Sequence, residues 1–244
     1  MRLAEKPRQQ LRMEDAMKAA PGRFETLDEL MRERRSVRGF LPALVPADVL
    51  QSVFATAQLA PSNCNVQPWV VHVVSGASAE AMRTALHDRA RSGAAVAPDF
   101  PLTGGYPGEY RTRQIDAAKA LFAATGVARE DVAARTQSFL RNFRFFDAPH
   151  AAFLFVPRWA GMREAADCGM YAQSLMLALT AHGLASCAQG ALSHHADVVR
   201  DQLDVSDDLL LLFGIAFGYE DAAHPANAAR TTRLSLDQAT IFHS

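Results

Sequence analysis

The chain has 244 residues, of which 49% are hydrophobic and 21% charged, a composition typical of globular proteins and unlike that of disordered ones. A chain of this length buries roughly 70% of its extended surface on folding, so a substantial core is expected. Its 25 Lys and Arg residues nearly balance its 26 Asp and Glu residues, and the formal net charge is −1. This balance argues against a nucleic-acid partner or an anionic membrane partner, so any anion site must be local.

The cysteines and the N-terminus indicate the compartment. Cys64, Cys168 and Cys187 share no C-x-x-C spacing, which argues against a disulfide framework and against a structural zinc site. Residues 1–18 lack the apolar run of a secretory signal, and the apolar stretch 209–219 is shorter than the ~20 residues that a membrane helix needs. We therefore expect a cytoplasmic protein with reduced thiols and no membrane partner.

The first part of the chain predicts two helices and a strand. A capping-box pattern predicts a helix over 26–34 with Thr26 as its N-cap. Apolar residues recur every three or four positions over 46–59, which predicts a second helix that Pro61 ends. Residues 69–74 are rich in β-branched side chains and should form a buried strand.

The middle of the chain predicts a helical insertion. Residues 79–147 contain several helical pieces and many aromatic side chains, and a second buried strand is expected at 151–156. We interpret 79–147 as a helical insertion that covers the active site. The expected organisation is an N-terminal extension over 1–25 and a single domain over 26–244.

The last part predicts a central helix and two more strands. Residues 163–182 are helix formers that are apolar or small on nearly every side, with Gly183 as the expected C-cap. A strand is expected at 184–188, and a long core strand at 209–219. Between them, a helix should run from an N-cap at Ser193 to residue 203.

The first candidate site is Arg34-Arg35-Ser36-Val37-Arg38, at the end of the first predicted helix. Arginine forks donate paired hydrogen bonds to phosphate, and a cation near N1 and O2 of a flavin stabilises the negative charge that appears on reduction. A solvated basic surface explains the same residues.

The second candidate site is the loop 60–69, which reads A-P-S-N-C-N-V-Q-P-W. Its Asn and Gln amides both donate and accept hydrogen bonds, as the polar edge of a flavin ring requires. Ordinary turn chemistry also explains Pro, Ser and Asn at these positions.

Two further candidates lie in the second half. Ser186–Gly190 ends a predicted strand, where Gly190 would let backbone approach a planar ligand and a backbone N–H could bond flavin N5. We interpret Cys187 in this segment as a core thiol rather than a nucleophile. Arg230 and Arg233 follow the last strand, where a phosphate clamp and an exposed tail explain them equally well.

The sequence lacks the motifs of metal sites and of several common enzyme folds. His194 and His195 have only Asp197 nearby as a further ligand, so no metal site is expected. No G-x-G-x-x-G, G-x-x-x-x-G-K-[ST] or G-x-S-x-G sequence occurs, which removes the defining loops of Rossmann, P-loop and hydrolase folds.

The order of these motifs resembles the nitroreductase superfamily. The chain has R-R-S-x-R, then A-P-S-N-x-N-x-Q-P-W, a small-residue central helix, Q-G and a final R-x-x-R. The resemblance runs from about Thr26 to Phe242. The middle region, with Tyr106, Tyr110 and the segment Phe145–Pro149, looks like the branch that reduces nitroaromatic compounds.

The resemblance implies an α+β sandwich with a central, mostly antiparallel sheet flanked by helices, and an intertwined homodimer with FMN at its interface. It also implies that the partner subunit lays the loop 61–65 against the flavin, while Gln67 and Trp69 anchor that loop. The residues it implies for FMN binding are Arg34, Arg35, Ser36, Arg38, Gln189, Gly190 and Arg233, with Arg230 leading into the C-terminal clamp, and Pro61, Ser62, Asn63 and Asn65 in the loop.

The implied reaction is ping-pong, in which NADH or NADPH gives hydride to flavin N5 and leaves before a nitroaromatic acceptor takes it. No side chain stands out as a general acid or base. A quinone, an activated alkene or a halogenated aromatic is an alternative acceptor. A non-catalytic FMN-binding protein and a purely structural helical protein are further alternatives. Tyr106, Tyr110, Phe143 and Phe145 are candidates either for stacking on an aromatic acceptor or for core packing.

Overall fold

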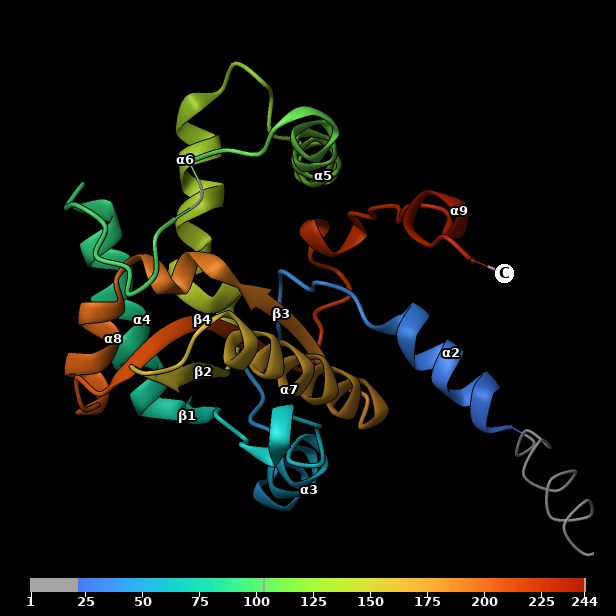
Figure 1. Cartoon of the computed structure of the whole chain (residues 1–244). Helices are drawn as coiled ribbons and strands as arrows, with labels where there is room; N and C mark the ends of the chain where they lie inside the picture. Colours follow the sequence, from blue (N-terminus) through green and yellow to red (C-terminus); the bar gives the residue numbers. More distant parts are fainter. Residues whose placement is uncertain (1–21, 103, 244) are drawn as a thin grey trace, which may run out of the picture.

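A four-stranded sheet forms the centre of the computed structural model, which describes residues 22–102 and 104–243 (Figure 1). The sheet order is β1-β2-β4-β3, and every neighbouring pair is antiparallel. The expected α+β fold and the four predicted strands are thereby confirmed. The strands are β1 (Val70–Ser75), β2 (His150–Pro157), β3 (Ala185–Gln189) and β4 (Leu209–Gly218).

Helices flank the sheet on both faces (Figure 1). None of the described helices is both long and apolar enough to cross a membrane. The α-helices are α2 (Arg23–Glu33), α3 (Ala47–Ala57), α4 (Gly76–Arg91), α5 (Gly108–Thr125), α6 (Val132–Leu140), α7 (Met162–Ala181), α8 (Ala196–Leu203) and α9 (Leu236–Ala239). The short 3₁₀ helices are η1 (Asn63–Asn65), η2 (Arg141–Asp147), η3 (Gly190–His194) and η4 (Pro225–Ala228).

Strand β2 shows how the core is divided. Phe153 and Phe155 pack into a cluster with α4, η2 and α8, whereas Leu154 and Val156 pack on the opposite face with α3 and α7. Successive side chains of a strand point to opposite faces, so a strand that is apolar at every position must be covered on both sides. The central helix predicted over 163–182 provides part of that cover as α7.

Two predicted helix starts are wrong, and in both cases the predicted capping hydroxyl bonds a preceding carbonyl. Helix α2 follows Gly22, which has a left-handed conformation, and Thr26 Oγ1 donates to the Gly22 carbonyl at 2.7 Å. Ser193 lies in η3 and donates to the Gly190 carbonyl at 2.8 Å, while α8 begins after His195. A hydroxyl can satisfy a preceding carbonyl as readily as it caps a helix, so the local pattern does not separate the two.

The domain boundaries proposed from the sequence stay predictions. Residues 1–21 of the expected N-terminal extension lie outside the described residues, and residues 23–25 belong to α2. The region 79–147 is largely helical, but its helices lie at different depths. Helix α4 buries Met82 and Leu86 in the core, whereas α5 buries no side chain and stands away from the sheet with α6 (Figure 1).

A buried histidine at the start of β2 forms hydrogen bonds with Val45 and Ser75. His150 is 1% exposed, and its Nε2 accepts a hydrogen bond from the Val45 backbone N–H at 2.9 Å. The proton of the neutral ring is therefore on Nδ1, which lies 2.6 Å from Ser75 Oγ. The ring stacks on Phe217, and burial lowers the pKa of His150.

We expect His150 to make the fold sensitive to mild acid. The folded protein keeps this histidine neutral, whereas the unfolded chain takes up a proton as the pH falls below about 6.5, so the free energy of unfolding should decrease there. Urea unfolding at pH 8, 7, 6 and 5.5 measures the effect. The His150→Phe variant removes the titrating group and should show a shallower fall between pH 7 and 5.5; an unchanged slope would contradict this role.

Candidate functional site

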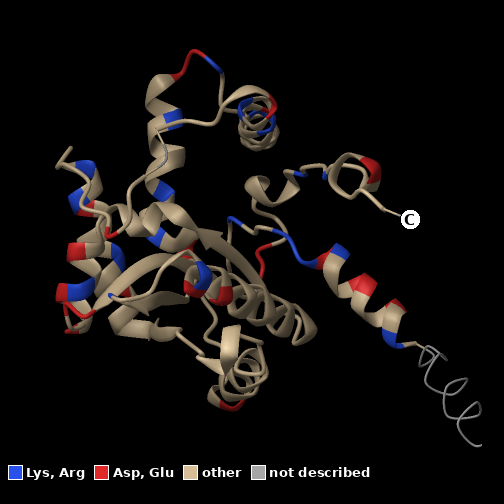
Figure 2. Ribbon diagram, in the orientation of Figure 1, with Lys and Arg blue, Asp and Glu red and all other residues tan. Residues whose placement is uncertain are grey.

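The first motif lies along the free edge of β3. Ser36 forms a parallel bridge with Ser186, and the Val37 N–H donates to the Ser186 carbonyl at 3.1 Å. Figure 2 shows the basic segment in the middle of the molecule, below α5 and beside β3. The motif follows the end of α2, and its arginines therefore lie beside the sheet rather than on a remote surface.

Asn227 connects this motif to Arg230 near the C-terminus. Its side chain is buried: Oδ1 accepts from the Arg38 N–H at 2.7 Å, and Nδ2 donates to the Gly39 and Asp221 carbonyls, each at 2.8 Å. Its own carbonyl accepts from Arg35 at 3.2 Å and from Arg230 at 2.6 Å. The role of Asn227 could not be predicted from the sequence, because an asparagine in a loop carries no local signal for contacts with residues near the opposite end of the chain.

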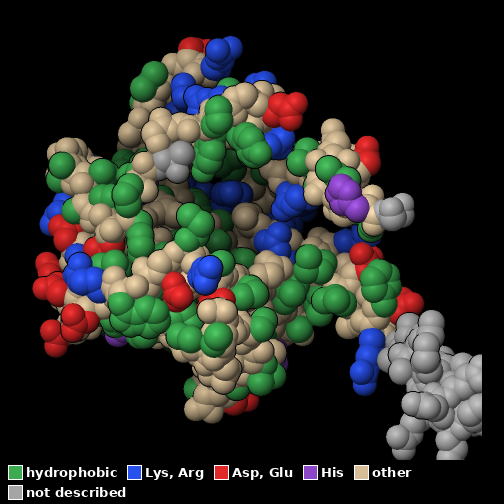
Figure 3. Space-filling model, viewed as in Figure 1, with side chains coloured by type: hydrophobic (Ala, Val, Ile, Leu, Met, Phe, Trp, Pro, Cys, Tyr) green, Lys and Arg blue, Asp and Glu red, His purple; other side chains and the backbone are tan. Residues whose placement is uncertain are grey.

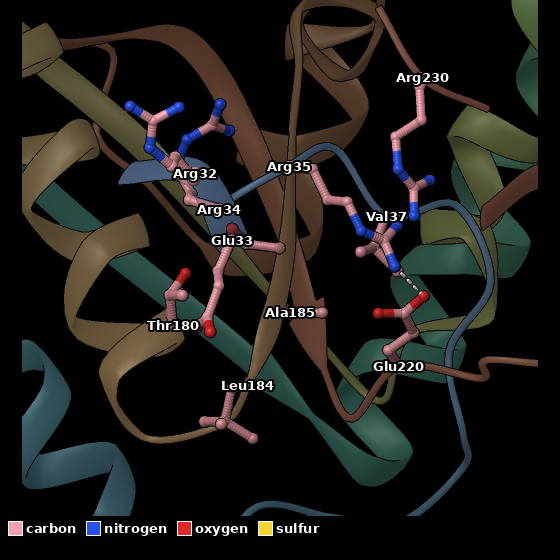
Figure 4. Close-up of a pocket in the computed structure, with 12 residues that line it drawn as sticks. Arg32, Glu33, Arg34, Arg35, Val37, Thr180, Leu184, Ala185, Glu220 and Arg230 are labelled. Carbon is pink, nitrogen blue, oxygen red and sulfur yellow. Dashed lines mark hydrogen bonds and ion pairs between the residues drawn. The ribbon is translucent and has the colours of Figure 1, made fainter. Parts of the chain in front are cut away.

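A cavity of about 440 Å³ opens beside these residues (Figure 4). Arg34, Arg35, Ser186, Glu220 and Arg230 contribute to its lining. Figure 4 shows Arg35 reaching Glu220, with which it forms an ion pair, and Arg230 beside it. The charge of Arg35 is thus already compensated within the chain.

Four other arginines of the candidate motifs have no carboxylate partner within the described part of the chain. Arg38 and Arg230 donate only to backbone carbonyls, Arg233 donates to Thr231 and a backbone carbonyl, and Arg34 has no side-chain hydrogen bond or ion pair there. Figure 3 shows Lys and Arg side chains inside a hollow on this face and along its edge. Guanidinium groups without carboxylates suit an anion such as a phosphate.

Strand β3 and the glycine that follows it add unsatisfied polar atoms and open space. Gln189 Oε1 and Ser186 Oγ are buried with no hydrogen-bond partner among the described residues. A Cβ added to Gly190 would meet no atom within 4 Å, so this glycine leaves room above the backbone. Buried polar groups normally find partners, and orphaned ones beside open space indicate where a ligand can bind.

The cysteine in β3, Cys187, is a core residue. Cys187 is buried, and burial raises the pKa of its thiol. A protonated, enclosed thiol is a poor nucleophile, so the interpretation as core packing is confirmed.

The second motif is anchored to the opposite end of α7. The Asn63 N–H donates to both carboxylate oxygens of buried Asp167, at 3.2 and 3.1 Å, and Trp69 stacks on Tyr171 at 5.0 Å. Thr180, which lines the cavity, lies thirteen residues beyond Asp167 on the same helix, ~20 Å away along its axis. Among the described residues, no hydrogen bond joins Pro61, Ser62, Asn63 or Asn65 to the candidate arginines.

Backbone strain is concentrated near the candidate motifs. Among the described residues, seven non-glycine residues have positive φ, and six of them lie in two short segments. These six are Cys64, Asn65 and Gln67 in the loop, and Phe145, Phe146 and Asp147 at the end of η2. Each left-handed residue costs about 1–3 kcal/mol, and such strain persists where packing and function over-determine the backbone.

The aromatic candidates separate into two groups. Phe143 and Phe145 are 1% and 0% exposed and belong to the core. Tyr106 and Tyr110 are 51% and 63% exposed. Only the two tyrosines remain available for an aromatic acceptor.

We expect Asn227→Asp to destabilise the fold. The substitution keeps an acceptor for the Arg38 N–H but replaces two donors with a carboxylate oxygen facing the Gly39 and Asp221 carbonyls. An unsatisfied buried group costs about 1–3 kcal/mol, and a buried charge costs more. Urea unfolding measures the loss. Asn65→Asp, on an exposed side chain, is the matched control and should change the free energy of unfolding by less than about 0.5 kcal/mol.

Comparison with known proteins gives one family. The model of the nitroreductase family matches residues 31–219. The chain is similar to the nitroreductase NfnB of Mycolicibacterium smegmatis, with 43% identity over 88% of this chain and 92% of that protein. It is also similar to the nitrobenzene nitroreductase of Ectopseudomonas oleovorans, with 31% identity over 88% of this chain and 96% of that protein.

Solved structures agree with this result. The FMN-dependent nitroreductase NfnB from Mycobacterium smegmatis, in complex with NADPH, superposes with a TM-score of 0.87 at 41% identity, over 91% of this chain and 99% of that one. The FMN- and NADPH-dependent nitroreductase NfnB from a Sphigopyxis strain superposes with a TM-score of 0.83 at 36% identity, over 89% of this chain and 98% of that one.

Proposed function

Because this chain belongs to the nitroreductase family, we propose that it is an FMN-dependent oxidoreductase that uses NADPH to reduce nitroaromatic compounds. The observation that carries the proposal is a set of arginines that have no carboxylate partner in the described part of the chain, close to the orphaned polar atoms of β3. Relatives described as nitrobenzene and 4-nitrobenzoate reductases support a nitroaromatic acceptor.

The residues around β3 fit FMN. Its phosphate carries up to two negative charges, which Arg34 and Arg233 would neutralise through charge-assisted hydrogen bonds. Ser36 and Arg38 would bind the ribityl chain and the N1/O2 side of the ring, while Gln189 and Gly190 would lie along the ring near N5. Arg230 would add a cation at the phosphate end. We keep Arg35 among the residues proposed to bind FMN, although Glu220 compensates its charge.

The protein contributes binding and electrostatics to the reaction. When bound, FMN supplies the redox chemistry by receiving hydride from NADPH and giving it to the acceptor. Arg38, which has no carboxylate partner in the described chain, would favour the negative charge of the reduced ring. The open space over Gly190 would allow the ring to lie close to the backbone.

We further propose that the site is completed by a second copy of the chain. Asn63 and Asn65 expose their side chains but are held at the far end of α7 from the arginines. A homodimer would bring the loop of the partner subunit to the FMN of the first. Exposed apolar side chains on α2 and the C-terminal segment, including Phe24, Leu27, Ile241 and Phe242, suit burial in such an interface.

The reaction is tested by anaerobic absorbance near 450 nm. Purified protein supplied with FMN should be yellow and should bleach when NADPH is added, and a nitrobenzoate should restore the colour. Parallel additions of NADH measure the preference between donors. Bleaching without recovery would reject the nitroaromatic acceptor, and a protein that takes up no FMN would overturn the whole assignment.

The shared site is tested by mixing two defective chains. Arg34→Ala with Arg233→Ala should weaken FMN binding by several kcal/mol, because charge-assisted hydrogen bonds contribute about 1.5–3 kcal/mol each. Asn63→Ala with Asn65→Gly should weaken it from the other side, and glycine accepts the positive φ of 57° at position 65. Mixed dimers are isolated through two different tags. One of their sites combines the intact arginines of one chain with the intact loop of the other, while the second site carries both defects. Such dimers should therefore bind about one FMN each.

Lys119→Ala with Arg129→Ala removes the same charge from exposed positions and serves as the control for net charge. Its FMN affinity should equal that of the unmodified protein. Mixed dimers that bind no more FMN than either parent, or a monomeric protein in analytical ultracentrifugation, would contradict the shared site.

A further inference from the structure

The short helix η2 contacts two of the residues proposed to bind FMN. Its Asn142 accepts hydrogen bonds from Gln189 Nε2 through the backbone carbonyl at 2.9 Å and through Oδ1 at 3.3 Å. Its Phe146 places the ring beneath the guanidinium of Arg38, 5.9 Å from the ring centroid. One seven-residue element thus reaches both the first motif and the end of β3.

The conformation of η2 is held by the core. Phe145, Phe146 and Asp147 have φ values of 57°, 54° and 69°, which side chains other than glycine adopt at a cost. Phe145 is fully buried against Phe153, with ring centroids 6.0 Å apart, and Arg83 donates to the Ala148 carbonyl at 2.8 Å. These contacts hold the backbone of the segment Phe145–Asp147 in place. The position of the Phe146 ring is therefore fixed as well.

Arg38 depends on that ring more than its neighbour does. Arg141 also lies over Phe146, at 5.8 Å, but it forms an ion pair with Asp147 at 3.3 Å. The guanidinium of Arg38 has the ring and the Ser36 carbonyl at 3.2 Å as its contacts, and no carboxylate within the described ranges. A cation over an aromatic face is attracted by the ring quadrupole, so Phe146 restricts where the charge of Arg38 can lie.

We propose that Phe146 is a positioning residue that holds the charge of Arg38 for the bound cofactor and thereby sets how much more tightly the protein binds reduced FMN than oxidised FMN. The inference rests on the proposed function, since it concerns the same site. Reduced FMN carries more negative charge than oxidised FMN, so a fixed cation favours the reduced form, whereas a guanidinium that moves into solvent favours it less.

The test is the two-electron midpoint potential of the FMN-loaded protein, measured by dye equilibration. Phe146→Leu keeps an apolar side chain but removes the ring, and the preference for reduced FMN should fall roughly three- to tenfold. A tenfold fall corresponds to a potential about 30 mV more negative. Arg38→Gln should shift the potential in the same direction, and adding Phe146→Leu to Arg38→Gln should produce no further shift.

Phe122→Leu is the matched control. Phe122 lies in α5, and Arg135 lies 5.8 Å from its ring centroid, so this variant removes a pair of similar geometry that does not include Arg38. Its potential should equal that of the unmodified protein. If Phe146→Leu folds poorly, Phe146→Met fills the space without a ring and should give the same shift.

Two outcomes would overturn the inference. One is an unchanged potential in a Phe146 variant that binds FMN and bleaches with NADPH. The other is an equal shift with and without Arg38, which would show that Phe146 acts through the fold alone. Either result leaves the proposed function intact, whereas failure of the unmodified protein to bind FMN would overturn the function itself.

Discussion

The side chain of Asn227 bonds three backbone groups that lie outside the named strands and helices: the Arg38 N–H and the Gly39 and Asp221 carbonyls. Arg38 and Asn227 are 189 residues apart in the sequence, yet the bond between them is 2.7 Å long. Because the amide is buried, water cannot easily replace these partners. Asn227 therefore holds the first motif beside the segment that leads to Arg230, together with the ion pair between Arg35 and Glu220.

Helix α7 imposes the second constraint. The uninterrupted apolar run of β2 requires cover on both faces of the sheet, and α7 provides it on one face. The same helix separates the loop at Asn63, bonded to Asp167 near one end, from the cavity at Thr180 near the other. In the proposed dimer, the partner subunit would supply this loop to the arginines.

The proposed site also contains groups that the fold leaves unsatisfied. Buried Gln189 Oε1 and Ser186 Oγ lack partners in the described chain, and η2 keeps strained residues beside Arg38. Each feature costs folding free energy that a bound ligand can offset. Asn142 and Phe146 connect the strain to the site, because they contact Gln189 and Arg38 from the same short helix.

Much of the fold could be read from the sequence. The β-branched and apolar runs predicted all four strands, and the small-residue run predicted α7, because these patterns follow from local periodicity and from burial. The motifs at Arg34–Arg38, in the loop 60–69 and at Gln189-Gly190 were likewise visible. Their residue types suit phosphate and flavin wherever the chain places them.

Only the tertiary structure decided how these parts meet. Asn227, Asn142 and Phe146 have no local signature, since each acts on a residue distant in sequence. The hydroxyls of Thr26 and Ser193 bond preceding carbonyls, although their local patterns predicted caps. Periodicity and propensity are properties of neighbouring residues, whereas hydrogen-bond partners, orphaned atoms and the distance between motifs arise only when the sheet and its helices pack.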